Sequence, residues 1–118
     1  MAEIDLAQSR RRYRELLEES LTALVAKLKQ RDDVLRVSIF GSYARGRADL
    51  FTDLDVLVIM DTATPFVQRQ QILYQLLASP VDLDILCYTP KEFESMKERP
   101  FLRHALRDER ILYEKKSA

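Results

Sequence analysis

The sequence has one cysteine, only two glycines and no long apolar run. The single cysteine, Cys87, excludes a disulfide within the chain and any cysteine-based zinc site built by one chain. This suits a reducing compartment, and we expect a cytoplasmic protein. No apolar run approaches the roughly 20 residues that span a bilayer, and the N-terminal stretch MAEIDLAQSRRRYRE has no apolar signal core. We therefore expect neither export by that route nor a membrane partner.

Neither charge is in excess, because 19 lysine and arginine residues balance 19 aspartate and glutamate residues. The chain as a whole offers no field that would attract nucleic acid or an anionic membrane. A basic run does occur in SRRRYRELLEES, residues 9–20, but glutamates follow the arginines on the same expected helix. Ion pairs on a solvated helix face explain this run more simply than contact with nucleic acid does. A nucleic-acid-binding module stays a lesser alternative, and its test is an affinity that depends on salt.

The chain has 118 residues, of which 47% are hydrophobic, and this fits one compact domain. A chain of this length is too short for two domains. Residues 8–31 contain neither glycine nor proline and carry an apolar stripe, which predicts a long amphipathic helix. Strands are expected at 34–40, 55–60, 81–88 and 110–114. Further helices are expected at 43–45, capped by Ser42, from Thr64-Pro65 to Ser79-Pro80, at 89–97 and at 101–107. This alternation predicts an α/β fold with a mixed sheet.

Carboxylates gather at the expected starts of two strands. Residues two apart in a strand face the same side, so Asp53 and Asp55 can point at one place above the sheet. Asp82 and Asp84 can do the same on the next strand. The helix between these strands is the usual parallel crossover, which would bring their starts side by side. The short link between 41 and 52 favours antiparallel pairing of the first two strands.

Such a cluster needs a counter-charge, because like charges that are buried together are strongly unfavourable. The candidate ligands are all hard oxygens, which favours Mg²⁺ or Mn²⁺ over zinc or copper. Two ions about 4 Å apart can hold the attacking and leaving oxygens of a displacement at phosphorus. Gly41-Ser42 would lie beside the aspartates and suits phosphate groups, with Arg45 or Arg47 as a further contact to a triphosphate. Each motif alone is more often a turn, so it is their conjunction that predicts a site.

The stretch GSYARGRADLFTDLDVLV, residues 41–58, resembles the signature of the minimal nucleotidyltransferases, the small branch of the DNA polymerase beta nucleotidyltransferase superfamily. The matching residues are Gly41, Ser42, Ala44, Arg45, Gly46, Asp53 and Asp55. The segments VDLDILCYTPKEF and PFLRHALRDERILYE also resemble later parts of that family, so the similarity runs from Val34 to Glu114. Thr52 departs from the usual serine but keeps a hydroxyl.

This resemblance implies a nucleotidyltransferase-like mixed sheet of about four strands flanked by helices, with a long N-terminal helix. The whole chain, 1–118, would be one such domain, with the helix at 8–31 and a catalytic core at 34–114. The phosphate-binding residues that the resemblance implies are Gly41 and Ser42, and the arginine considered above, Arg45 or Arg47, would lie beside them. The implied metal ligands are Asp53, Asp55 and a third carboxylate, for which Asp84 is favoured by its distance to Thr89-Pro90 and Asp82 is the alternative.

The implied reaction moves a nucleoside monophosphate, AMP from ATP being the expected case, to a hydroxyl and needs two Mg²⁺ or Mn²⁺ ions. The family is similar to the antitoxin half of HEPN/MNT toxin–antitoxin pairs, in which a HEPN ribonuclease is adenylylated on tyrosine. A HEPN-type partner protein is therefore expected. Assembly of this chain into a homo-oligomer is a further possibility. The alternative is a non-catalytic antitoxin that neutralises its partner by occlusion.

Overall fold

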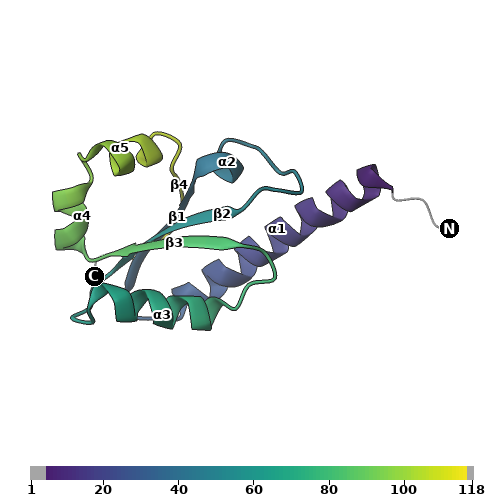
Figure 1. Cartoon of the computed structure of the whole chain (residues 1–118). Coiled ribbons are helices and arrows are strands. Elements are labelled where there is room, and N and C mark those ends of the chain that lie inside the picture. The colour runs from purple at the N-terminus through teal and green to yellow at the C-terminus, as the bar shows by residue number, and fades with distance from the viewer. Residues whose placement is uncertain (1–4, 117–118) are drawn as a thin grey trace.

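The computed structural model describes residues 5–116, and its elements alternate as the sequence predicts (Figure 1). The helices are α1 (Leu6–Lys29), α2 (Gly41–Ala44), α3 (Phe66–Leu77), α4 (Pro90–Met96) and α5 (Pro100–Leu106). The strands are β1 (Val34–Phe40), β2 (Leu54–Met60), β3 (Leu83–Tyr88) and β4 (Arg110–Glu114). The predicted α/β class with a long N-terminal helix is confirmed.

One mixed sheet has the strand order β3-β2-β1-β4. β2 pairs antiparallel with β1 and parallel with β3, and both pairings are those predicted. In this register Phe40 lies opposite Asp55, and Asp55 lies opposite Asp84. The sheet therefore brings the glycine-serine step and two of the carboxylates to neighbouring strands at one end.

Two apolar layers cover the sheet. The larger core joins α1 and α3 to one face, with Leu17, Leu24 and Leu73 fully buried. A smaller core on the other face lies under α4 and α5, with Leu102 as its most buried helical residue. Figure 1 shows α4 and α5 on the side of the sheet opposite α1 and α3. None of the helices within residues 5–116 is long and apolar enough to cross a membrane.

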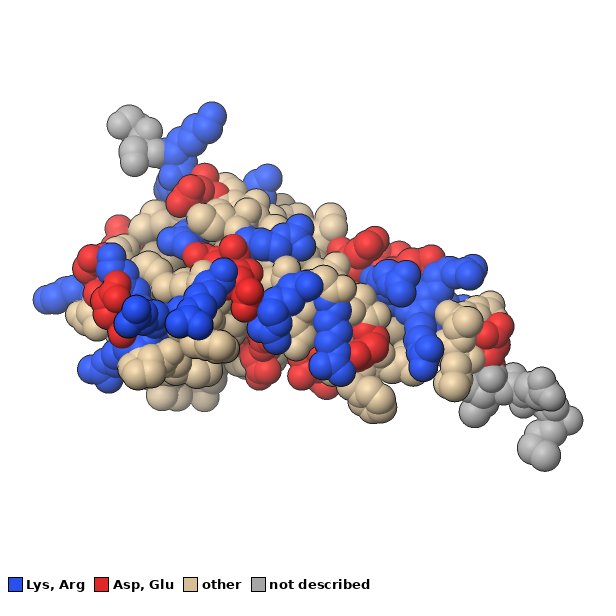
Figure 2. Space-filling model, turned by 90° about the horizontal axis from the view of Figure 1, so that it is seen from above, with Lys and Arg blue, Asp and Glu red and all other residues tan. Residues whose placement is uncertain are grey.

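The charged side chains show no large region of one sign on the face seen in Figure 2, where lysines and arginines alternate with aspartates and glutamates. This distribution agrees with the equal numbers of positive and negative residues in the sequence. Long-range attraction of a polyanion by this face is therefore weak.

The first short helix begins two residues earlier than the sequence predicts. α2 starts at Gly41, with Phe40 in the N-cap position, so Ser42 is not the cap. The physical reason is the backbone of Gly41, whose φ of +73° turns the chain directly out of β1. The hydroxyl of Ser42 is thereby left available at the surface of a cavity described below.

The start of α3 also differs, because Pro65 occupies the N-cap position in place of Thr64. The carbonyl of Thr64 accepts from the guanidinium of Arg69 instead, at 2.8 Å from Nη2. By contrast, the capping box predicted at Thr89 and Glu92 is confirmed in both of its hydrogen bonds. β3 begins at Leu83, two residues later than expected.

Arg69 is a buried cation that joins three elements. Only 3% of the residue is exposed, and its guanidinium donates to the carbonyls of Thr64 and Cys87 and to the carboxylate of Glu92 at 2.7 Å. The hydrogen bond from Arg69 lowers the pKa of Glu92, and the charge of Arg69 acts in the same direction. These bonds fix the start of α3 and the end of β3 relative to α4.

Replacing Arg69 with methionine should therefore lower the free energy of unfolding by about 2–3 kcal/mol, because two buried carbonyls lose their donor. Urea unfolding followed by circular dichroism measures this change. The exposed Gln68→Ala on the same helix is the matched control and should stay within about 0.5 kcal/mol of the parent. A loss below about 1 kcal/mol for Arg69→Met would mean that water replaces these bonds.

Candidate functional site

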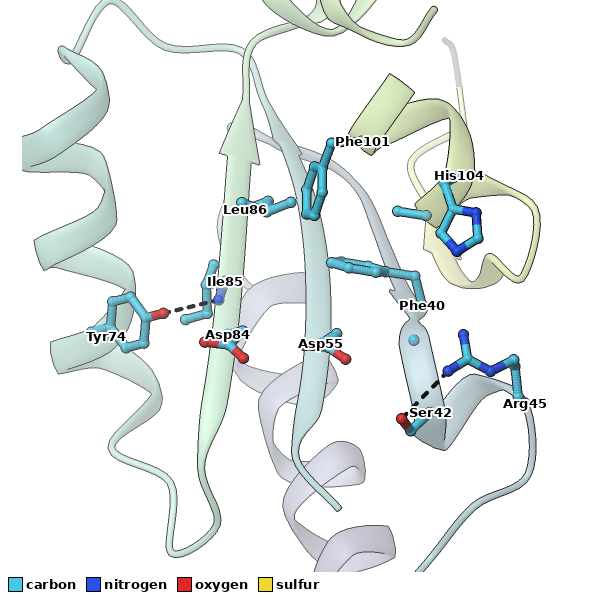
Figure 3. Close-up of a pocket in the computed structure, with 12 residues that line it drawn as sticks. Phe40, Ser42, Arg45, Asp55, Tyr74, Asp84, Ile85, Leu86, Phe101 and His104 are labelled. Carbon is cyan, nitrogen blue, oxygen red and sulfur yellow. Dashed lines mark hydrogen bonds between the residues drawn. The ribbon is translucent and has the colours of Figure 1, made fainter. Parts of the chain in front are cut away.

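A cavity of about 560 Å³ opens on the sheet face that α5 partly covers, beside the start of β2 (Figure 3). Its volume is that of a small-molecule site. Its walls come from β1, α2, β2, α3, β3 and α5 and are made by Phe40, Gly41, Ser42, Arg45, Asp55, Tyr74, Asp84, Ile85, Leu86, Phe101, His104 and Ala105. One end is polar and carries the aspartates, Ser42 and Arg45, and the other end is apolar.

Asp55 and Asp84 are the acidic residues of this cavity. They lie opposite each other on neighbouring parallel strands, and Figure 3 shows their side chains close together on the sheet. The pKa of Asp55 is raised to about 6, and burial is the largest cause. The charge of Asp84, the hydrogen bond between the Asp55 and Asp84 side chains and the charge of Asp53 raise it further. The charge of Arg45 acts in the opposite direction. Near neutral pH this pair therefore carries clustered negative charge that favours a cation.

The donor set fits magnesium. Both groups are hard oxygen donors, and Mg²⁺ is commonly held by one or two carboxylates with water and substrate phosphates completing its shell. Within residues 5–116, no three acidic, histidine or cysteine side chains already meet at one metal position. Asp55 and Asp84 are thus the protein ligands that the cavity itself offers, and further ligands would be water, phosphate or Asp53.

Gly41 makes the close approach of α2 to this pair possible. A Cβ at Gly41 would lie 2.1 Å from Oδ2 of Asp55, far inside van der Waals contact. Gly46, the other glycine, also has a positive φ, of +96°, but a Cβ there would meet no atom of residues 5–116 within 4 Å. Only Gly41 is therefore required both by its backbone conformation and by the carboxylate that packs against it.

The two arginines named by the sequence are separated by the structure. Arg45 lines the cavity, where its guanidinium donates to Asp108 at 3.2 Å and approaches the hydroxyl of Ser42 at 3.5 Å. Arg47 does not line the cavity and forms an exposed ion pair with Asp49 at 2.5 Å. Of these alternatives, the structure brings only Arg45 to the candidate phosphate-binding end.

The two other aspartates lie outside the cavity wall. Asp53 precedes β2, and with Asp82 it raises the pKa of Tyr13, for which burial is the largest cause. Asp82 is exposed and borders a neighbouring depression. The register therefore favours Asp84 over Asp82 as the third carboxylate, since only Asp84 shares the cavity with Asp55.

The loop before β2 is fixed by hydrogen bonds that the sequence did not reveal. The Tyr13 hydroxyl, on α1, donates to the Thr52 carbonyl at 2.8 Å. The Thr52 hydroxyl donates to the carboxylate of Asp49 and accepts from its backbone N–H, both at 3.0 Å. Thr52 is 2% exposed, so a hydroxyl at this position satisfies buried groups just ahead of Asp53.

The structure also adds cavity residues that sequence reasoning missed. His104 and Phe101 come from α5, far along the chain from the aspartates, and Phe101 is 67% exposed. His104 is exposed and its side chain lies at the cavity wall. The only available signal was the helical spacing of Phe101, His104 and Ala105, which places them on one side of α5.

A family model described as nucleotidyltransferase domain matches residues 21–113. The chain is 36% identical over 72 residues to "Protein adenylyltransferase MntA" of Thermococcus cleftensis, an alignment that covers 58% of this chain and 73% of that protein.

Two solved structures share the fold. A nucleotidyltransferase-type protein from Sulfolobus solfataricus aligns with a TM-score of 0.56 at 18% identity, covering 98% of this chain and 93% of its own. A mutant of the toxin–antitoxin MntA–HpeT aligns with a TM-score of 0.51 at 18% identity, covering 84% of this chain and 73% of the matched chain. At 18% identity these two similarities show a shared fold and nothing more.

Proposed function

This chain belongs to the nucleotidyltransferase domain family and is of the minimal nucleotidyltransferase type, and from that premise we propose that it transfers AMP from ATP to a hydroxyl group. The observation that carries this proposal is the pairing of Asp55 with Asp84 across parallel strands, with Gly41 packed against Asp55. A clustered negative charge beside a glycine-serine turn has no evident role in folding. It suits a cation-bound triphosphate.

The residues divide the reaction between them. Ser42 and Arg45 would bind the outer phosphates, since a hydroxyl and a guanidinium both donate to phosphate oxygens. The acceptor oxygen attacks the α-phosphorus, the bond to the β-phosphate's bridging oxygen breaks, and pyrophosphate leaves. Asp84, the more exposed carboxylate, would accept the proton of the attacking hydroxyl. Two Mg²⁺ ions, or Mn²⁺, would neutralise charge at the phosphates when bound with Asp53, Asp55 and Asp84.

We propose further that the acceptor hydroxyl lies on a partner protein, a toxin of the HEPN type. The support is the name of the curated relative, a protein adenylyltransferase, and the toxin–antitoxin pair among the structural neighbours. The cavity is open at the surface, with exposed Phe101 and His104 at its rim, so a hydroxyl on a second protein can reach it.

The test is incubation of the purified protein with magnesium and each α-labelled nucleoside triphosphate, alone and with the product of the neighbouring gene. We expect a labelled adduct of AMP mass on the partner, formed only with ATP and magnesium. Adduct formation should fall at least about 10³-fold in Asp53→Asn. Mass analysis of both proteins identifies the donor and the acceptor together.

The same experiment separates catalysis from occlusion. If Asp53→Asn still neutralises the partner in cells while making no adduct, the chain is a binding antitoxin. If no triphosphate gives an adduct on any protein, the proposed transfer is wrong. Loss of neutralisation together with loss of the adduct supports the enzyme.

A further inference from the structure

We propose that Tyr74, on α3, is a positioning residue that holds Asp84 in place through the backbone on both sides of it. This inference rests on the proposed function, in which Asp84 is a metal ligand. Tyr74 stands outside the sequence motifs, and its ring lines the cavity next to Asp84 and Ile85 (Figure 3).

β3 is an edge strand of the described sheet, because within residues 5–116 the order β3-β2-β1-β4 leaves one of its sides without a strand. The Asp82 carbonyl accepts from the N–H of Leu54 in β2 and so points toward β2. Because the backbone N–H and C=O groups of successive residues in a strand point to opposite sides, those of Leu83 and Ile85 point away from β2, toward the open edge. Outward groups on an edge strand need other partners or remain open to water and to fraying.

Tyr74 supplies those partners on both sides of Asp84. Its hydroxyl accepts from the backbone N–H of Ile85 at 3.0 Å and donates to the carbonyl of Leu83 at 3.3 Å. The residues before and after Asp84 are therefore both bonded to one oxygen atom. Since the Asp84 side chain is exposed, packing does not fix it, and the position of its backbone sets where the carboxylate lies relative to Asp55.

Gln70, one turn earlier on α3, does the same for the next part of the edge. Its amide donates to the carbonyl of Ile85 at 2.5 Å and accepts from the N–H of Cys87 at 3.1 Å. Gln70 does not line the cavity. The chain therefore contains a matched pair of edge contacts, of which one flanks Asp84 and the other does not.

The test measures Mn²⁺ binding by electron paramagnetic resonance on the full chain and on the variants Tyr74→Phe, Gln70→Met, Asp84→Asn and Tyr74→Phe with Asp84→Asn. Phenylalanine keeps the ring in the cavity and removes only the hydroxyl. We expect Tyr74→Phe to weaken Mn²⁺ binding about 10-fold, as loss of an outer contact to a ligand does, and Gln70→Met to change it less than about 2-fold. In the Asp84→Asn background Tyr74→Phe should have no further effect, because its action passes through Asp84.

Hydrogen exchange on the same proteins checks the bonds themselves. The Ile85 amide should exchange faster in Tyr74→Phe and the Cys87 amide faster in Gln70→Met. The positioning role is wrong if Tyr74→Phe binds Mn²⁺ as tightly as the wild type although its Ile85 amide exchanges faster and Asp84→Asn binds Mn²⁺ more weakly. The proposed function would survive that result. Equal weakening by Gln70→Met also overturns it, since the effect would then be general to the edge. A wild-type protein that binds no Mn²⁺ contradicts the proposed function and this inference with it.

Discussion

Replacing Gly41 with alanine should reduce nucleotidyl transfer by at least about 10²-fold, since a misplaced reactive group costs that much even when the rest of a site survives. The added Cβ would lie 2.1 Å from Oδ2 of Asp55, so the carboxylate must turn away from its place opposite Asp84. The positive φ of Gly41 adds strain of about 1–2 kcal/mol for an L side chain. The measurements are adduct formation, Mn²⁺ affinity and thermal unfolding of the same preparation.

Gly46→Ala is the control for that strain. Gly46 also has a positive φ, but none of the residues that the structure describes lies within 4 Å of an added Cβ there. The variant should lose a similar amount of stability, about 1–2 kcal/mol, and keep transfer within a few-fold of the parent. Equal activity losses in the two variants would show that backbone strain, and not the approach to Asp55, explains the effect.

Replacing Asp55 with asparagine should abolish transfer and at the same time stabilise the metal-free protein at pH 8. The pKa of Asp55 is raised from 3.8 to about 6, so the folded state prefers the neutral carboxyl. Its contribution to stability is therefore present below pH 4 and is lost as the pH rises through about 6. Asparagine removes this charge, and after allowance for solvent we expect a gain of about 1–2 kcal/mol at pH 8 in chelator.

Thermal unfolding in chelator at pH 4 and at pH 8 measures that gain. The difference between Asp55→Asn and the parent should be small at pH 4 and amount to several degrees at pH 8. Added Mg²⁺ should raise the melting temperature of the parent and have less effect on the variant. Asp61→Asn, at an exposed position after the other end of β2, is the control and should show neither change. A difference that does not vary with pH would mean that ionised Asp55 is not destabilising.

Much of the fold was predictable because its signals are local. An unbroken stripe gave α1, β-branched runs gave the strands, and Thr89 with Glu92 formed the expected capping box. The errors lie at element ends. Ser42 was expected to cap a turn that in fact begins at Gly41, because a positive φ allows the chain to turn immediately after β1.

The sequence by itself indicated which kind of site to expect, one for phosphate groups and a cation. Asp53, Asp55 and the glycine-serine step lie within one short stretch, and their spacing is a local property. Only the tertiary structure decided which distant residues join them. The parallel register puts Asp84 and not Asp82 opposite Asp55, and α2 directs Arg45 but not Arg47 to the cavity. The packing of α3 and α5 brings Tyr74 and Phe101 to the same walls. Strand register and helix docking depend on contacts between segments that are far apart in the chain. The hydrophobic periodicity within one segment does not specify these contacts.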